Sequence, residues 1–497
     1  MRLVVLFAMA ASAHAGVVSQ DWSDGTLSLK LDDGSARMEW IGPRAFRVQR
    51  SWGTGESSTT RIAHPAVDVT RNGLRMVSRY LTVDIDRDTS VVVRTGATPI
   101  ATIGISRGAR GAEVRFAPMD RVYGLRGGGR GGLNLHGEKL ARGRGFFFTS
   151  DGYGVFMLAP ALCAFDFDKG VVEAQGAEEI EFIFYYGPTP KEILEQHTLV
   201  TGRAEDPGAI ENRVVDGWEG VEDLVRALNE ESLSATLNSK INVTVADRAP
   251  RDVRRRVADL AALVPGLRDE DSGDRSLQVS LRPYWDTYRR EALDRGYPLL
   301  RPLLVEYPKD AGMDARADLF MLGDELLVAP VMADGDTRRV DLPRGSWTDL
   351  RSNVEYQGRH VVDVKAESDG GVPVFARNGA IVPMAVPDVM ELHYFSSAAG
   401  EFFLWEPELN DNSQFHAAPA GDEMRVEIES KVARTYEWVL HHVDAPVQVA
   451  EETGVYVQEE TRGKLRSGSW WRDEERGDVH IMIRAEAGSD VVVNLKF

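Results

Sequence analysis

Apolar and polar residues alternate at both ends of the chain, in short runs separated by turn sequences. Thr26–Leu31 is one such run near the N-terminus, and Val479–Phe497 closes the chain with the same pattern. Alternation with a period of two predicts strands that bury one face, and regularly spaced short strands predict a β-sandwich. The sequence therefore predicts a β-sandwich region at each end.

The middle of the chain carries helical and strand-length patterns in turn. Apolar residues recur at helical spacing over 218–237 and predict an amphipathic helix. A β-branched run then predicts a strand over 238–247. A second helix is predicted over 252–264, with Asp252 as its N-cap.

A further helix and two apolar runs follow. The helix is predicted from Trp285 to Gly296, where glycine and a nearby proline stop the pattern. The apolar runs, at 299–306 and 326–329, have the length of buried strands. Apolar strands joined to helices are typical of a parallel sheet covered by helices, such as an α/β barrel.

Three sequence blocks in this part of the chain resemble a known family. They are Arg282-Pro-Tyr, Gly296-Tyr-Pro-Leu-Leu-Arg-Pro-Leu and Phe320-Met-Leu-Gly-Asp-Glu-Leu-Leu-Val-Ala-Pro-Val. Together they are similar to the end of the catalytic barrel of glycoside hydrolase family 31, which contains α-glucosidases and α-xylosidases. The block from Tyr185 to His197 resembles the linker helix of that family, and the block from Pro373 to Pro383 resembles its proximal C-terminal sandwich.

The barrel that this resemblance implies is incomplete. A whole (β/α)8 barrel takes about 250 residues, and the residues between the linker and Met332 leave room for about half of one. We therefore expect a multidomain α+β protein with an N-terminal β-sandwich, a truncated (β/α)8-type barrel remnant and C-terminal β-sandwich domains. The expected boundaries are 1–15 for a signal peptide, 16–208 for the N-terminal β-sandwich and linker helix, 209–332 for the barrel remnant, 333–395 for the proximal C-terminal sandwich and 396–497 for a distal C-terminal β domain.

The resemblance also implies residues of a catalytic site. Residues 256–268, Arg-Val-Ala-Asp-Leu-Ala-Ala-Leu-Val-Pro-Gly-Leu-Arg, follow the frame of a helix that comes after the acid/base aspartate in the family. In this frame Asp247 falls on the acid/base aspartate and Arg268 on a substrate-binding arginine. Trp218 starts the preceding helix, as a tryptophan does in the family, and is the second expected substrate-binding residue.

The surroundings of two of these residues depart from the family pattern. Asp247 is followed by Arg248-Ala-Pro-Arg251 instead of Ile-Gly-Gly-Phe, and Arg268 by Asp269-Glu270-Asp271 instead of a histidine. An aspartate neutralised by Arg248 or Arg251 is a poor acid, because a positive neighbour lowers a carboxyl pKa. An arginine held in salt bridges by the acidic run is the corresponding structural interpretation of Arg268.

A nucleophile is missing from the pattern. Retaining glycosidases need two carboxylates about 5–5.5 Å apart, one as nucleophile and one as acid/base. The family's nucleophile stretch, of the type Trp-x-Asp-Met-Asn/Ser-Glu, does not occur in this sequence. Asp216, which ends the strand-like run Arg213–Asp216, is the candidate substitute, and a solvated loop aspartate is the alternative.

Two functional hypotheses follow, and a third is structural. The chain is either a retaining α-glycosidase with Asp247 as acid and an unidentified nucleophile, or a catalytically inactive relic of the family that binds glycans or serves as a structural partner. The missing nucleophile stretch favours the second. The third hypothesis is an internal deletion product that does not fold stably. An α-glycoside is the expected ligand, and the sequence gives neither the sugar, the linkage nor the oligomeric state.

Composition narrows the partners and the location. The net charge of −19 argues against nucleic acid and anionic membranes as partners. Residues 1–15 combine a basic start, an apolar stretch and a small-x-small cleavage site, which predicts a signal peptide and a secreted or periplasmic protein. No other run reaches the length of a membrane span. Cys163 is the single cysteine, which excludes an intrachain disulfide, and no cofactor or metal is implied, because His441 and His442 would point to opposite faces of a strand.

Overall fold

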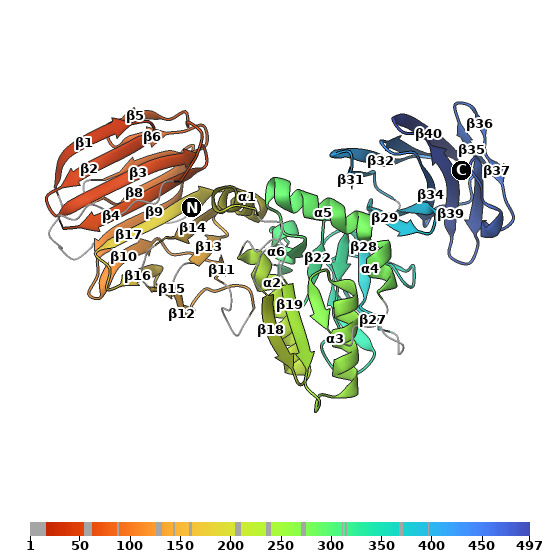
Figure 1. The fold of residues 1–497 in the computed structure, drawn as a ribbon, viewed down its shortest axis with the longest axis horizontal. Coiled ribbons are helices and arrows are strands. Elements are labelled where there is room, and N and C mark those ends of the chain that lie inside the picture. The colour runs from red at the N-terminus through yellow and green to blue at the C-terminus, as the bar shows by residue number, and fades with distance from the viewer. Residues whose placement is uncertain are drawn as a thin grey trace. The chain divides into compact units, whose positions relative to one another are not determined.

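A computed structural model describes most of the chain. The described residues are 16–53, 62–86, 89–125, 132–142, 145–158, 162–203, 210–234, 240–269, 275–310, 312–313, 316–366, 371–395 and 397–497. The predicted signal peptide lies outside them. The chain divides into two compact units, Met1–Gly202 and Arg203–Phe497, whose elements are labelled in Figure 1.

The first unit is a β-sandwich, as predicted. One sheet has the order β1 (Val17–Ser23), β2 (Thr26–Leu31), β3 (Gly34–Gly42), β4 (Ala45–Trp52), β17 (Glu179–Tyr186), β14 (Tyr153–Met157), β13 (Gly145–Thr149), β11 (Val122–Gly124). The other has the order β12 (Lys139–Arg142), β15 (Cys163–Asp166), β16 (Val171–Gln175), β10 (Gly111–Phe116), β9 (Thr98–Arg107), β8 (Val91–Thr95), β7 (Thr82–Ile85), β6 (Arg75–Val77), β5 (Thr70–Asn72). A single apolar cluster, which includes Phe46 and Val93, draws side chains from both sheets.

The predicted linker helix closes this unit. Helix α1 (Pro190–Thr201) begins with a capping box, in which Thr189 and Glu192 each satisfy a backbone N–H of the other. Its side chains at Ile193 and His197 are buried, and the helix packs on β14 and β17. The amphipathic pattern therefore docks the helix on the sandwich.

The second unit begins with alternating strands and helices. The order is β18 (Ile210–Val215), α2 (Trp218–Leu233), β19 (Lys240–Val245), α3 (Arg251–Leu263), β20 (Leu267–Asp269), and the strands form a parallel three-stranded sheet (Figure 1). The predicted elements are present, although Asp252 is not the N-cap of α3. Pro250 precedes the first helical residue and no side chain caps the helix, so Asp252 lies inside its first turn.

An antiparallel sheet follows two helices, α4 (Ser276–Ser280) and α5 (Arg282–Arg295). Its order is β21 (Leu300–Pro302), β22 (Phe320–Leu322), β23 (Leu326–Val328), β28 (Val374–Arg377), β25 (Ser346–Asp349), β26 (Glu355–Gln357). A short helix, α6 (Leu303–Glu306), follows β21, and β24 (Thr337–Asp341) pairs with β27 (Val361–Lys365).

The expectation of parallel strands over 299–306 and 326–329 is therefore wrong. The first run divides into β21 and α6 at Pro302, which precedes the helix. The second run turns back on β22 as a hairpin, because Gly323 adopts a positive φ of 62° that favours glycine. As a result, one sheet joins strands on both sides of residue 332.

The C-terminal part is a second β-sandwich, as the alternating pattern predicted, and it begins at β29, within the range expected for the proximal domain. One sheet has the order β29 (Ile381–Val386), β30 (Val389–Phe395), β34 (Arg434–His441), β39 (Asp478–Ala485), β38 (Ser469–Asp473), β37 (Val457–Gln458). The other has the order β31 (Gly400–Glu406), β32 (Asp411–Ala420), β33 (Glu423–Ser430), β40 (Ser489–Lys496), β35 (Gln448–Glu451), β36 (Gly454–Val455).

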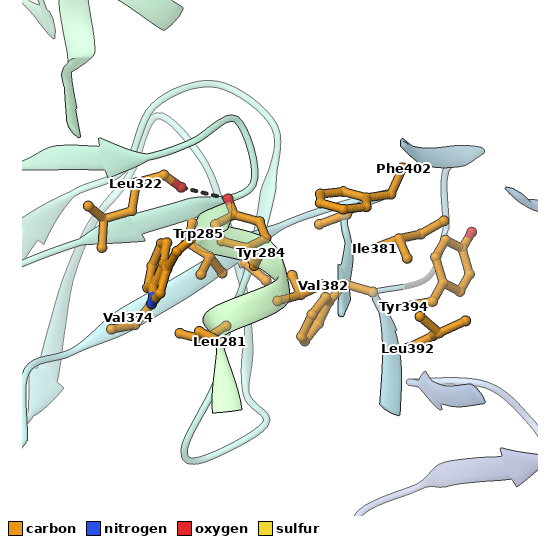
Figure 2. Packing of buried hydrophobic residues seen from close by; sticks show 14 of the residues in the cluster. Leu281, Tyr284, Trp285, Leu322, Val374, Ile381, Val382, Leu392, Tyr394 and Phe402 are labelled. Carbon is orange, nitrogen blue, oxygen red and sulfur yellow. Dashed lines mark hydrogen bonds between the residues drawn. The ribbon is translucent and has the colours of Figure 1, made fainter. Parts of the chain in front are cut away.

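Helix α5 joins the parts of this unit through one hydrophobic core. Tyr284 donates a hydrogen bond of 2.6 Å to the carbonyl of Leu322 in the antiparallel sheet, and its ring stacks on Phe402 of β31 (Figure 2). The same cluster continues from the parallel sheet to the C-terminal sandwich. The three parts of the second unit therefore share a core.

Candidate functional site

The carboxyl ends of β18 and β19 lie side by side. Val215 is in register with Val245, and the backbone N–H of Ala246 donates to the carbonyl of Val215 at 2.9 Å. Asp216 and Asp247 follow these two strand ends directly. In open α/β sheets, ligands bind outside the carboxyl ends of the strands. A ligand site is therefore expected at this edge.

The two candidate carboxylates have different surroundings. Asp216 forms an ion pair with Arg248, and 49% and 80% of their respective side chains are exposed. Asp247 is exposed in a turn that is closed by a 2.9 Å hydrogen bond from the N–H of Ala249 to the carbonyl of Ala246. Arg248, one of the two arginines expected to neutralise Asp247, pairs with Asp216. A glycosidase acid requires a partly desolvated pocket, and an exposed turn does not provide one.

The two expected substrate-binding residues do not meet at this edge. Arg268 is in register with Asn242 on the neighbouring strand, three residues before the end of β19 at Val245. At 3.3 Å per residue this is about 10 Å from the carboxyl end. Trp218 is the first residue of α2 and is partly buried against the core of the unit. The structure thus brings Asp216 and Arg248 together and places Arg268 farther along the sheet.

Helices cover one face of the parallel sheet, and among the described residues several side chains on the other face are exposed. Buried apolar side chains of the strands, such as Val215 and Val243, pack with α2 and α3. On the opposite face Thr244 and Arg268 are exposed, and the Nδ2 of Asn242 donates to the Oδ1 of Asn212 at 3.1 Å. This open face therefore presents amide, hydroxyl and guanidinium groups, which can hydrogen-bond to a polar ligand.

A buried arginine on the antiparallel sheet pairs with several carboxylates in an ion cluster, and none of these residues was among the predicted site residues. Arg301 is fully buried and pairs with Glu291 of α5, with Glu306 of α6 at 2.9 Å, and with Asp324 of the β22–β23 hairpin. Burial alone would lower the pKa of Arg301, but the charges of Asp324, Glu306 and Glu291 outweigh this and raise it. The signal in the sequence is an arginine inside an apolar run. Because its guanidinium is enclosed, Arg301 links these elements and is not itself accessible to a ligand.

Glu325, next to this cluster, is a buried carboxyl group whose proton affinity is altered. Burial raises the pKa of Glu325 to about 7, although the positive charge of Arg377 lowers it. Perturbed carboxyls mark functional sites in many proteins. Only 3% of Glu325 is exposed, however, so its position argues for a structural role.

A second chain of polar side chains runs along one sheet of the C-terminal sandwich, from β30 through β34 to β39. His393 Nδ1 and His441 Nε2 are 3.0 Å apart, and their other ring nitrogens contact Glu391 at 2.9 Å and Asp478 at 3.0 Å. Burial lowers the pKa of His441 to about 4. The pairing of two histidines 48 residues apart has no local signal in the sequence.

Within the described ranges, no group of three or more His, Cys, Asp or Glu residues is arranged to hold a metal ion.

Comparison with known families places the antiparallel sheet in a described domain. Residues 296–382 match the profile described as "Glycosyl hydrolase family 31 C-terminal domain". The matched residues run from the end of α5 to β29 and include Arg301 and the β22–β23 hairpin. The profile match therefore covers Arg301, Glu306 and Asp324 of the ion cluster but not Glu291, and it does not reach the parallel sheet.

Curated relatives also match over a limited length. An isomaltosyltransferase of Sporosarcina globispora is 35% identical over 108 residues, which is 22% of this chain and 10% of that protein. An α-glucosidase of Saccharolobus solfataricus is 33% identical over 108 residues, 22% of this chain and 15% of the relative. The chain thus matches well under two thirds of the length of these relatives.

Solved structures match the fold over a much longer range. A family 31 dextranase of Flavobacterium johnsoniae, complexed with glucose, has a TM-score of 0.84 to this chain at 12% sequence identity. The alignment covers 98% of this chain and 100% of the other. At this level of identity the likeness shows a shared fold.

Among the described helices, none combines the length and apolar character needed to cross a membrane.

Proposed function

Because the chain is a member of glycoside hydrolase family 31, we propose that it binds α-linked glycans on its parallel sheet and does not hydrolyse them. We further propose that β18, β19 and β20, with α2 and α3, are the remnant of the family's (β/α)8 barrel. The βαβαβ order and the parallel register of these strands support this origin. A whole barrel has eight parallel strands, and this sheet has three.

The ion pair between Asp216 and Arg248 is the observation that carries the proposal against hydrolysis. A retaining mechanism needs a free carboxylate as nucleophile and a second carboxyl, held protonated, close to it. Asp216 is engaged by the guanidinium of Arg248, and Asp247 stands in an exposed turn. Water at both groups would compete with any sugar and would weaken the electrostatic contribution to catalysis.

Glycan binding is supported by the chemistry of the open face. Asn212, Asn242, Thr244 and Arg268 supply donors and acceptors on one side of the sheet. The dextranase with the same fold was solved with glucose and, as a variant, with isomaltotriose. We therefore take α-linked glucose oligomers as the first ligands to test.

Hydrolysis by Asp247 and Asp216 is the second candidate function. The observation in its favour is that both aspartates follow the carboxyl ends of neighbouring parallel strands. This is the edge at which barrel enzymes place catalytic residues. Binding of a glycan there would also exclude water, which would strengthen the contribution of both carboxyl groups.

A paired assay separates the two functions. We expect no hydrolysis of aryl α-glucoside or aryl α-xyloside above buffer, with wild type and Asp247→Asn alike. We expect isothermal titration calorimetry with isomaltotriose to show binding that Arg268→Ala weakens by about tenfold, since a hydrogen bond to a charged group is worth about 1.5–3 kcal/mol. Arg282→Ala is the matched control, because it removes an exposed arginine from α5.

Each outcome of the hydrolysis and binding assays supports or contradicts a specific part of the proposal. Turnover by the wild type that Asp247→Asn abolishes would contradict the proposal and establish a reduced glycosidase. Equal binding by wild type and Arg268→Ala would move the ligand off the open face. No binding by a folded wild type would contradict the glycan-binding function itself.

We also propose that the protein is exported, on the basis of the signal-peptide pattern of residues 1–15. The proposal of export rests on the sequence of these residues alone. Deletion of residues 2–15 is expected to retain the protein in the cytoplasm, while the full chain appears in the exported fraction without these residues. Fractionation with N-terminal sequencing measures both outcomes, and an uncleaved cytoplasmic full chain would contradict the proposal.

A further inference from the structure

Strand β18 is an edge of the parallel sheet. Its neighbour is β19, and no other strand of the described part of the chain pairs with it. The unpaired N–H and C=O groups of an edge strand attract another strand unless the edge is blocked. The β18 sequence, Ile-Glu-Asn-Arg-Val-Val, contains no proline, its two charged residues are of opposite sign, and Val214 is 71% exposed. This edge is therefore open to pairing.

The hydrogen bond to β19 fixes which residues face outward. The carbonyl of Val215 accepts from the N–H of Ala246, so the backbone groups of Val215 point to β19. Backbone groups alternate in direction along a strand. Arg213 and Glu211 thus point to β19 as well, whereas Asn212 and Val214 present their backbone N–H and C=O groups to the outer edge.

We propose that two copies of this chain pair through β18, antiparallel and with their two-fold axis at Asn212. In this register Asn212 lies opposite Asn212 of the second copy, and Glu211 lies opposite Arg213 of the second copy. The outward-facing residues form the hydrogen-bonded positions. Glu211 and Arg213 fall on the non-hydrogen-bonded positions, where facing side chains lie closest together.

The charged residues of β18 in both copies of the chain fit this antiparallel register. Because the axis passes through Asn212, each copy supplies one glutamate and one arginine, and two cross-strand pairs of opposite charge form. Such an interface is isologous, with the same patch used by both copies. A glutamate and an arginine placed symmetrically about the central residue are what this self-complementarity requires.

The side chains are already arranged for these contacts. Arg213 Nη2 and Glu211 Oε1 of one chain are 2.5 Å apart on the same side of the strand, with 30% and 25% of their side chains exposed. The buried Nε of Arg213 has no hydrogen-bond partner in the part of the chain that the structure describes. A second copy would bring a further carboxylate beside this guanidinium. It would also cover Val214, which lies on the other face of the same strand.

Charge reversal tests the register with the full chain. We expect native mass spectrometry to show a dimer for the wild type. Glu211→Arg and Arg213→Glu each place like charges opposite one another twice, and each is expected to weaken dimerisation by about tenfold or more. An equimolar mixture of these two variants restores opposite charges across the interface only, and is expected to form heterodimers. A monomeric wild type, or single variants that dimerise as tightly as the wild type, would overturn the proposal.

A double variant guards against loss of folding. The combined Glu211→Arg and Arg213→Glu exchange preserves the pair within the chain and the self-complementarity of the edge, so the variant is expected to dimerise with itself. Mixed with wild type it meets like charges at both positions, and the two chains are expected to remain in separate homodimers. Statistical exchange between the two dimers would show that the interface lies elsewhere.

Discussion

Replacing Arg301 by methionine is expected to destabilise the Arg203–Phe497 unit by about 3 kcal/mol, because the change leaves three partly buried carboxylates without the buried guanidinium that pairs with them. Glu291, Glu306 and Asp324 all contact this one guanidinium, which is fully buried. Methionine fills a similar volume but supplies no positive charge. The loss would be a large part of the total stability of a typical domain, about 5–15 kcal/mol.

The matched control is Arg289→Met on α5. Arg289 pairs with Asp286 one turn earlier at 2.9 Å, but both side chains remain substantially exposed. An exposed pair contributes about 0–1 kcal/mol, so this variant is expected to change the free energy of unfolding by less than about 1 kcal/mol. Urea unfolding of the intact chain, followed by hydrogen-exchange mass spectrometry on peptides of β21 and β22, measures both. Equal effects of the two substitutions would show that the buried cluster does not stabilise the unit.

Local sequence patterns predicted helices and strands of this unit but not which strands pair with one another. Local patterns predicted β18, α2, β19 and α3, because each buries one face and so carries its own periodicity. The same patterns found the strand at 326–329 but gave it the wrong neighbours. Its direction is set by the hairpin at Gly323 and by pairing with β28, whose residues lie far along the chain. A run of apolar residues indicates that a strand is buried, but it does not indicate which strand pairs with it.

The arrangement of the candidate site could not be predicted from the sequence for a similar reason. The resemblance identified Asp247 and Arg268 by their place in a motif, and in the structure Arg268 lies upstream of the carboxyl edge at which Asp247 stands. The ion pair of Asp216 with Arg248 depends on the register of β18 against β19. Register is a tertiary property that residue types alone do not determine. The open polar face likewise follows from the number of strands and helices that pack together.

Acid is expected to weaken the docking of α1 on the first unit, through His197. The imidazole of His197 stacks on Phe146 with ring centroids 3.8 Å apart, and Phe156 and Tyr185 contact its edge or face. Burial lowers the pKa of His197 to about 3 from its ordinary value of 6.5. The folded unit therefore holds this ring neutral, and the unfolded or undocked chain takes up the proton first as the pH falls.

The sign and size of the effect follow from this difference. Between pH 6.5 and pH 3 the undocked state binds more protons, so stability falls as the pH falls through this window. At pH 4.5 the loss amounts to about 3 kcal/mol, since each pH unit below the ordinary pKa costs about 1.4 kcal/mol.

The variant His197→Phe is expected to remove this pH dependence while keeping the aromatic stack on Phe146. The Nδ1 of His197 is buried without a hydrogen-bond partner among the described residues, so phenylalanine leaves no polar group unsatisfied. Hydrogen-exchange mass spectrometry of α1 peptides, corrected for the intrinsic exchange rate at each pH, compares the variant with wild type from pH 6.5 to 4.5. His136→Gln removes an exposed imidazole and separates the effect of burial from that of losing a histidine. If wild type and His197→Phe lose protection equally on acidification, the buried imidazole does not control the docking of α1.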